Sequence, residues 1–248
     1  MGNGDSTEHH YHTEVIYKIP EETLKLLDEQ AKQLKAFEEE AKKRNDPKLY
    51  TKNATKLLDK FIERLPSLKL TDAIKKKTGE NHIGVIGPIS SGKTSFINAL
   101  FGIKLKVALG NCTEGCNIVH SENENVIWDV CGTNDDYMFY DPKSLSFVAS
   151  LDTIAILFDN DIAMISNMLK VINAINPNAM VVIRTKVDQH NSLNIRSVTE
   201  EVELDKSKLN CLLGRDIKVY CISSLNILNK TGYPYDWKEV RSVLKLAN

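Results

Sequence analysis

Four residues with the spacing G-x4-G-K-T offer the first chemistry in this sequence: Gly87, Gly92, Lys93 and Thr94. This spacing is typical of a phosphate-binding P-loop between a strand and a helix. Glycines at both positions let successive backbone N–H groups wrap around phosphate oxygens, and the following helix points its positive end at them. We expect Lys93 to meet the outer phosphates and Thr94 to bind Mg²⁺ through its hydroxyl. Further nucleotide contacts are predicted for Ser90, Ser91 and Ser95.

A D-x-x-G segment, Asp129 to Gly132, begins within a short apolar run. A carboxylate at the end of a strand can bind Mg²⁺ through water, and the N–H group of a glycine can meet the γ-phosphate. The region between residues 104 and 120 contains Thr113, which we expect to sense the γ-phosphate and Mg²⁺. The predicted metal ligands are therefore Thr94, Thr113 and Asp129, and the predicted catalytic residues are Lys93, Thr113 and Gly132.

The segment Arg184–Asp188, which reads RTKVD, favours guanine as the base. The Asp188 carboxylate can accept two hydrogen bonds, one from the ring N–H of guanine and one from its exocyclic amine. Adenine offers no such pair of donors, so a site built around Asp188 rejects adenine. We expect Thr185 to contact the nucleotide and Lys186 to lay its aliphatic stem over the base. Two further contacts, expected through backbone N–H groups at the end of the last apolar run, are Ser223 and Ser224.

Short buried strands that alternate with helices must position these residues. Continuous apolar runs predict strands at His82–Ile86, Val126–Val130, Thr153–Phe158, Met180–Ile183 and Ile217–Ile222. Helical patterns lie between and after them, at Lys93–Phe101, Asp161–Ile175, Val198–Leu212 and Trp237–Leu246. This alternation predicts an α/β fold in which a mostly parallel sheet has helices on both faces. Ligands of such sheets bind at the carboxyl ends of the strands, where the candidate residues lie.

A helical segment over residues 20–80 is expected before the nucleotide-binding G domain, residues 81–248, and after a flexible tail, residues 1–19. Pro20 and two acidic residues begin a helix that runs to about Arg44. Its apolar stripe is expected to contain Leu24, Leu27, Ala31, Leu34 and Ala41. A second helix is expected from about Thr51 to Leu65, with an apolar stripe of Leu57, Leu58, Phe61, Ile62 and Leu65.

Three stretches make the chain resemble GTPases: SGKTSFINALFG (Ser91 to Gly102), NVIWDVCGTN (Asn125 to Asn134) and RTKVD (Arg184 to Asp188). More narrowly, the sequence resembles the immunity-related GTPase family, which is interferon-inducible and dynamin-related, over residues 20 to 246. The resemblance implies a Ras-like G domain that binds GTP, GDP and Mg²⁺ and hydrolyses GTP. It also implies a role in cell-autonomous defence at intracellular membranes. Septin-type and other dynamin-like GTPases share the generic motifs and stay open as alternatives.

The sequence departs from that family at three points, and the first is the region between residues 104 and 120, where the neighbours of Thr113 match the family only loosely. Cys131 stands where many members have proline before the glycine of D-x-x-G, which leaves the loop less constrained. Members usually continue into a sizeable C-terminal helical domain, whereas this sequence ends at Asn248, just after the last expected helix. We therefore expect either that the chain is a fragment or that its N-terminal helices bury their apolar stripe in some other way.

The residues after Gly132, TNDD at positions 133–136, contain no glutamine. Ras-like enzymes use a glutamine there to orient the attacking water, so slow intrinsic hydrolysis is expected. In the family that the chain resembles, the accelerating partner is a second copy that meets the first nucleotide face to nucleotide face. The expected assembly is therefore a homodimer or oligomer in the GTP state. A nucleotide-bound scaffold with negligible hydrolysis is the alternative.

Composition and the start of the chain limit the partners and the compartment. Lys and Arg total 32 against 33 Asp and Glu, a formal net charge of −1, so no nucleic-acid partner is expected. The chain begins without a charged-then-apolar leader, so secretion by that route is not expected. Its five cysteines, an odd number mostly in apolar runs, predict reduced thiols in the cytoplasm. The start M-G-x-x-x-S places Gly2 in a pattern for N-myristoylation. One acyl chain anchors weakly, so association with intracellular membranes should be reversible; the Lys75–Lys77 cluster is an alternative contact with anionic lipid.

Overall fold

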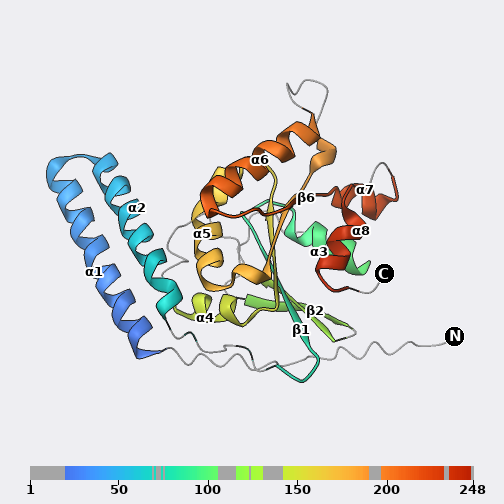
Figure 1. The fold of residues 1–248 in the computed structure, drawn as a ribbon, viewed down its shortest axis with the longest axis horizontal. Helices are drawn as coiled ribbons and strands as arrows, with labels where there is room; N and C mark the ends of the chain where they lie inside the picture. Colours follow the sequence, from blue (N-terminus) through green and yellow to red (C-terminus); the bar gives the residue numbers. More distant parts are fainter. Residues whose placement is uncertain are drawn as a thin grey trace.

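A six-stranded sheet lies at the centre of the chain (Figure 1). The computed structural model describes residues 20–68, 70, 74, 76–105, 116–122, 124–130, 142–189, 197–231 and 235–246. The strand order is β2-β3-β1-β4-β5-β6. The strands are β1 (Asn81–Ile86), β2 (Cys116–Glu122), β3 (Asn125–Val130), β4 (Thr153–Phe158), β5 (Met180–Arg184) and β6 (Val219–Cys221). Only the β2–β3 pair among them is antiparallel, which confirms the predicted mostly parallel sheet.

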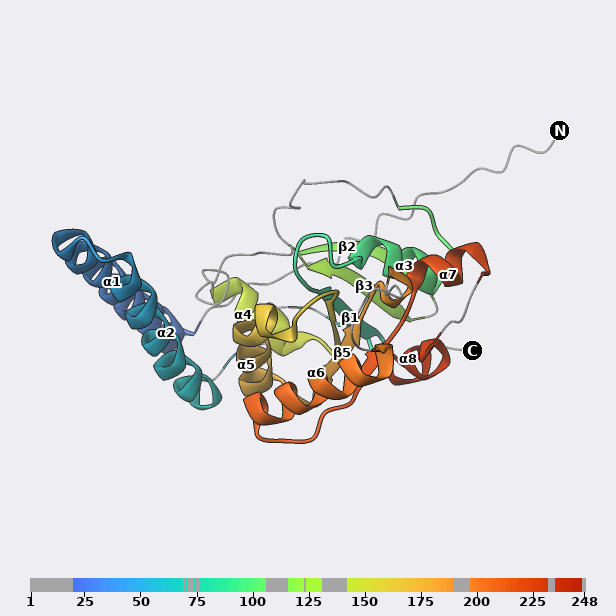
Figure 2. The same cartoon turned by 90° about the horizontal axis from the view of Figure 1, so that it is seen from above.

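Helices cover both faces of this sheet, as Figure 2 shows. One face carries α3, α7 and α8, and the other carries α4, α5 and α6. The helices are α3 (Lys93–Phe101), α4 (Pro142–Ser150), α5 (Ser166–Ile175), α6 (Val198–Leu213), α7 (Ser224–Asn229) and α8 (Trp237–Val243). Short 3-10 turns lie at Leu65–Ser67, Ile162–Ile165, Pro177–Ala179 and Val187–Gln189. The predicted α/β architecture is therefore confirmed.

Three elements, β2, α4 and α7, were not expected from the sequence. β2 reads CNIVHSE and has no continuous apolar run, because it is an antiparallel strand at the edge of the sheet. α4 and α7 are short helices of nine and six residues. The last strand is also shorter than predicted, since pairing with β5 covers Val219–Cys221 only.

The N-terminal helices form a hairpin beside α4 and α5 (Figure 1). Its helices are α1 (Glu21–Arg44) and α2 (Pro47–Arg64). The predicted start of α2 at Thr51 is wrong, because the Asp46 carboxylate accepts hydrogen bonds from the next N–H groups, those of Lys48 and Leu49, and so begins the helix earlier. None of the described helices combines the length and the apolar character needed to cross a membrane.

The apolar stripe of α2 is buried against α5 and its neighbours, and Lys170 of α5 pairs with Asp59 of α2 at 2.9 Å. The stripe of α1 is rotated from the prediction: Leu24 is 46% exposed, whereas Leu26 and Leu27 are buried. The hairpin thus buries its apolar side chains on α5 and its neighbours. The division of the chain after residues 19 and 80 stays a prediction.

The β6 edge of the sheet is closed by Asp236, which directly precedes α8. The Asp236 N–H group donates to the Cys221 carbonyl at 3.0 Å, and the Cys221 N–H group donates to Asp236 Oδ2 at 2.8 Å. The Cys221 thiol lies 3.4 Å from the same oxygen. Burial first, and then the Asp236 charge, raises the pKa of the Cys221 thiol to about 12, so the thiol stays protonated at neutral pH.

A buried histidine joins β1 to β3. The Trp128 indole N–H donates to His82 Nδ1 at 3.0 Å, and an indole can only donate. His82 Nδ1 is therefore unprotonated, and His82 Nε2 carries the hydrogen toward Glu80 Oε2, 3.2 Å away. The other charged groups near the ring are Asp152 and Lys76, which pair at 2.8 Å. Burial lowers the pKa of His82 more than Glu80 raises it.

We predict that His82 makes the fold less stable as the pH falls below 6.5. Because the pKa of His82 is lower in the folded protein, the unfolded chain takes up the proton first as the pH falls. The contribution of neutral His82 to the free energy of unfolding is therefore fully present above pH 6.5 and declines below it. Glu80 and Asp152 have lowered pKa values and therefore act only at more acidic pH. Urea unfolding at pH 7.5 and pH 5.5, followed by the fluorescence of the two tryptophans, Trp128 and Trp237, should show a smaller pH effect in His82→Gln. Equal pH effects in both proteins would contradict this prediction.

Candidate functional site

The loop between β1 and α3 has the backbone geometry that the G-x4-G-K-T pattern predicts. A Cβ atom at Gly87 would lie 2.3 Å from the Leu157 carbonyl oxygen, so no side chain fits there. Gly92 has φ +89° and Ser90 has φ +66°, both in the left-handed region. The two glycines are thus required by close approach in one case and by backbone conformation in the other.

Lys93 begins α3, and its ammonium lies at the loop itself. Its Nζ atom donates to the carbonyls of Gly87 and Pro88, each at 2.9 Å. No described side chain caps the start of α3. The backbone N–H groups in its first turn, among them those of Thr94 and Ser95, therefore have no side-chain acceptor among the described residues. A helix start of this kind suits an anion, with the Lys93 charge beside it.

Asp129 lies near the end of β3, opposite Val85 of β1. Its Oδ1 atom is buried and has no hydrogen-bond partner among the described residues. Burial raises the pKa of Asp129, and the nearby Lys93 charge partly offsets that rise. A buried carboxylate oxygen with an unused lone pair fits a cation such as Mg²⁺, which prefers oxygen ligands.

Several predicted site residues lie outside the described residues: Gly2, Thr113 and Gly132, and Cys131 beside the last. Their roles stay predictions. Within the described residues there is also no cluster of three or more His, Cys, Asp or Glu side chains that could hold a metal ion.

Thr185 joins the RTKVD segment to the loop between β1 and α3. Its hydroxyl lies 2.6 Å from the Ser91 carbonyl oxygen and 3.1 Å from the Phe158 carbonyl oxygen, and both Thr185 and Ser91 are buried. The side chain predicted to contact the nucleotide is therefore engaged with the protein's own backbone. The Ser91 hydroxyl is buried and has no hydrogen-bond partner among the described residues, and the Ser91 N–H group donates to the Pro88 carbonyl at 3.2 Å.

The ends of β5 and β6 bring Asp188 and the serine pair into neighbouring segments. Asp188 lies half-buried in the turn after β5, where the Val187 N–H group donates to the Ile222 carbonyl at 3.5 Å. Ser223 is buried and caps α7, accepting a hydrogen bond from the Asn226 N–H group at 3.1 Å. The Ser224 hydroxyl is buried and has no partner among the described residues. These residues lie at the carboxyl edge of the sheet, as expected.

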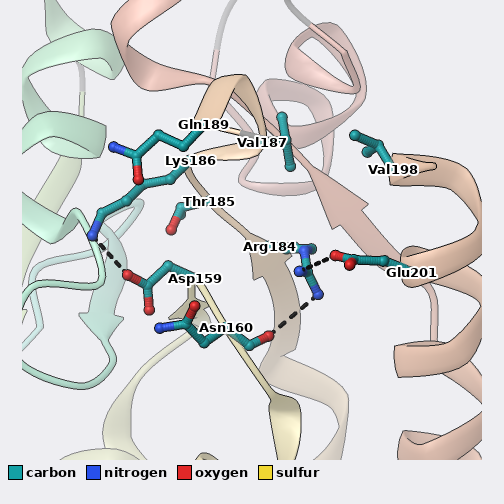
Figure 3. A pocket seen from close by; sticks show the side chains of 9 residues that line it. All are labelled: Asp159, Asn160, Arg184, Thr185, Lys186, Val187, Gln189, Val198 and Glu201. Carbon is teal, nitrogen blue, oxygen red and sulfur yellow. Dashed lines mark hydrogen bonds and ion pairs between the residues drawn. The ribbon is translucent and has the colours of Figure 1, made fainter. Parts of the chain in front are cut away.

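A polar cavity of about 280 Å³ adjoins the RTKVD segment (Figure 3). Its lining contains Asp159, Asn160, Arg184, Thr185, Lys186, Val187, Gln189, Val198 and Glu201, and Asp188 is not among them. Asp159 Oδ2 accepts from Lys186 Nζ at 2.6 Å, and Arg184 forms ion pairs with Glu201 and Asp205. Asp159 and Glu201 belong to no motif of the sequence. Asp159 could have been proposed from the sequence, because it is the first charged residue after an apolar strand and such residues often lie at a ligand site.

Comparison with known proteins gives only distant similarity. Neither a protein-family model nor a curated protein matches the chain. Among solved structures, the chain is similar to a GTP-binding protein from the hyperthermophilic archaeon Sulfolobus solfataricus in complex with GDP, with 17% identity and a TM-score of 0.43 over 92% of this chain and 67% of that one. The chain is also similar to a complex of SsGBP and GDP, with 18% identity and a TM-score of 0.45 over 90% of this chain and 67% of that one.

A bacterial selenocysteine-specific elongation factor, EF-Sec, is similar with 13% identity and a TM-score of 0.46, over 68% of this chain and 29% of that one. The first of these three proteins is named as GTP-binding and the first two are complexes with GDP, and none of the three is named as an immunity-related GTPase. At these identities and TM-scores, neither a family nor an activity is transferred to this chain.

We predict that Thr185→Val destabilises the protein, although the two side chains have nearly the same shape. The Ser91 carbonyl loses its buried donor, and an unsatisfied buried group costs about 1–3 kcal/mol in the free energy of unfolding. Thr199→Val, at an exposed position on α6, is the matched control. Urea unfolding of both variants measures the difference. Equal losses of stability would show that the Thr185 hydroxyl contributes nothing specific.

Proposed function

We propose that this chain binds guanine nucleotides with Mg²⁺ and hydrolyses GTP to GDP and phosphate. The observation that carries the proposal is the hydrogen bond between Thr185 and the Ser91 carbonyl, which fixes the RTKVD segment against the phosphate loop. A base held at Asp188 and phosphates held at Lys93 would then be bound by two segments in fixed relation. A preorganised pair of sites loses less entropy when the nucleotide binds.

Each residue has a role that follows from its chemistry. Lys93 and the N–H groups at the start of α3 bind the β- and γ-phosphates, and Asp188 accepts both donors of guanine. Backbone N–H groups at Ser223 and Ser224 bind the guanine oxygen. Mg²⁺, held by Thr94 and through water by Asp129, neutralises the charge that develops on the phosphates. Thr113 and Gly132 are proposed to contact the γ-phosphate.

Nucleotide competition against a fluorescent GDP analogue tests this function. GTP and GDP should displace the analogue and ATP should not, because adenine lacks the two donors that Asp188 accepts. Asp188→Asn should weaken guanine binding by at least 100-fold, since a buried polar mismatch costs about 3 kcal/mol or more, and should improve xanthine binding. Lys93→Ala is the contrasting variant, because it should weaken every nucleotide whatever the base. Equal competition by ATP against the unmutated protein would exclude the guanine assignment.

Hydrolysis, self-association and membrane attachment are further parts of the proposal. Because TNDD follows Gly132, a second copy is proposed to complete the active site across the nucleotide face. Exposed apolar side chains near this face support the contact: Ile89 in the phosphate loop is 40% exposed, and Leu225 and Leu228 of α7 are 55% and 42% exposed. An acyl group on Gly2 would anchor such an assembly to an intracellular membrane, where cell-autonomous defence is the proposed role.

We predict that GTP turnover per molecule rises with protein concentration. If two copies complete one active site, a hundredfold dilution below the dissociation constant of the dimer should lower specific activity about tenfold or more. Gly2→Ala should leave turnover in solution unchanged while releasing the protein from membranes. Specific activity that stays constant over the dilution would rule out the dimer mechanism. Turnover that is absent at every concentration would favour the nucleotide-bound scaffold instead.

A further inference from the structure

Lys186 is fixed at both ends of its side chain. Its backbone has φ +56°, in the left-handed region that non-glycine residues seldom adopt. Its Nζ atom lies 2.6 Å from Asp159 Oδ2, and the two side chains are 31% and 21% exposed. Figure 3 shows the Lys186 side chain extending from the end of β5 toward Asp159, which follows β4. The ion pair therefore holds the long aliphatic stem in one extended conformation.

The end of β4 supports consecutive residues of the RTKVD segment. The Thr185 N–H group donates to the Phe158 carbonyl at 2.8 Å, and the Thr185 hydroxyl lies 3.1 Å from the same oxygen. Asp159 is the next residue and holds Lys186. The base-reading segment thus takes its position from Phe158 and Asp159 together, one through the backbone and the other through a charged side chain.

We infer that Asp159 is a positioning residue that prepares Lys186 to receive the planar face of a guanine base. This inference rests on the proposed function and extends it to a residue that no motif contains. A lysine side chain is among the costliest to immobilise, so a stem that is already extended raises affinity for the base without touching the ligand. The carboxylate also neutralises the ammonium, which leaves an apolar stem as the surface that the base meets.

Asp161 provides a matched control in the same loop. Its carboxylate accepts from Lys208 Nζ at 2.9 Å and from the Ala163 N–H group at 3.0 Å, and it has no contact with Lys186 in the described structure. Asn is a good replacement in both positions, because it keeps the size and can still accept hydrogen bonds. Asp159→Asn and Asp161→Asn therefore remove the same charge from the same loop, and only the first removes it from Lys186.

Dissociation constants for GDP test the inference. Asp159→Asn should weaken GDP binding about three- to tenfold, the cost of immobilising one long side chain at binding, and Asp161→Asn should not. In a Lys186→Met background, which keeps an unbranched stem without the charge, adding Asp159→Asn should change the GDP dissociation constant by less than twofold. Pyrophosphate, which carries no base, should bind the protein and Asp159→Asn equally.

The outcomes separate the inference from the proposed function. If the unmutated protein binds no guanine nucleotide, the proposed function fails. If it binds GDP but Asp159→Asn binds GDP equally well, or if the effect of Asp159→Asn persists in the Lys186→Met background, the positioning role is wrong. Equal weakening of pyrophosphate and GDP would also overturn it, because a general disturbance of the loop would affect both. Thermal unfolding of Asp159→Asn establishes that each comparison uses folded protein.

Discussion

One buried hydroxyl joins three adjacent strand ends, and the candidate site depends on it. Thr185 follows β5 and lies within hydrogen-bond distance of carbonyls in the loop after β1 and at the end of β4, the two strands that come next in the sheet. Ser91 and Thr185 are 94 residues apart in the sequence. No water can replace the bond without opening the core, since both residues are buried. The spacing between the β1–α3 loop and the RTKVD segment therefore follows from one side chain.

The interior of the fold was predictable from the sequence, and its periphery was not. Strands that are buried on both faces read as continuous apolar runs, so β1, β3, β4 and β5 were found within one residue at either end. The edge strand β2 carries His120 and Ser121 among apolar residues and gives no such signal. The apolar stripe of α1 was misplaced because Thr23 and Gln30 are buried in the hairpin, and periodicity reasoning assigns polar residues to the exposed face.

In the candidate site, the backbone requirements were predictable from the sequence, whereas the partners of the side chains were not. Gly87 is required by the close approach of another backbone, and Gly92 is required by its positive φ, in any loop of this shape. The partners of the side chains were not readable, because they depend on which strand ends are neighbours. The Lys186–Asp159 pair joins residues 27 apart that meet only because β4 and β5 are adjacent. The hydroxyl of Thr185 likewise points into the protein, which the order of residues in RTKVD does not reveal.

The closure of β6 by Asp236 has a consequence for how copies of this chain can associate. An edge strand usually offers free N–H and C=O groups that a strand from another molecule can pair with. Here both outward-facing backbone groups of Cys221 are already occupied by one aspartate, and the paired part of the strand is only three residues long. A neighbouring molecule that tried to extend the sheet at this side would have to displace Asp236 and expose its carboxylate. Continuous cross-molecular β-structure is thereby discouraged at the β6 edge, and contacts through helices and loops are favoured there.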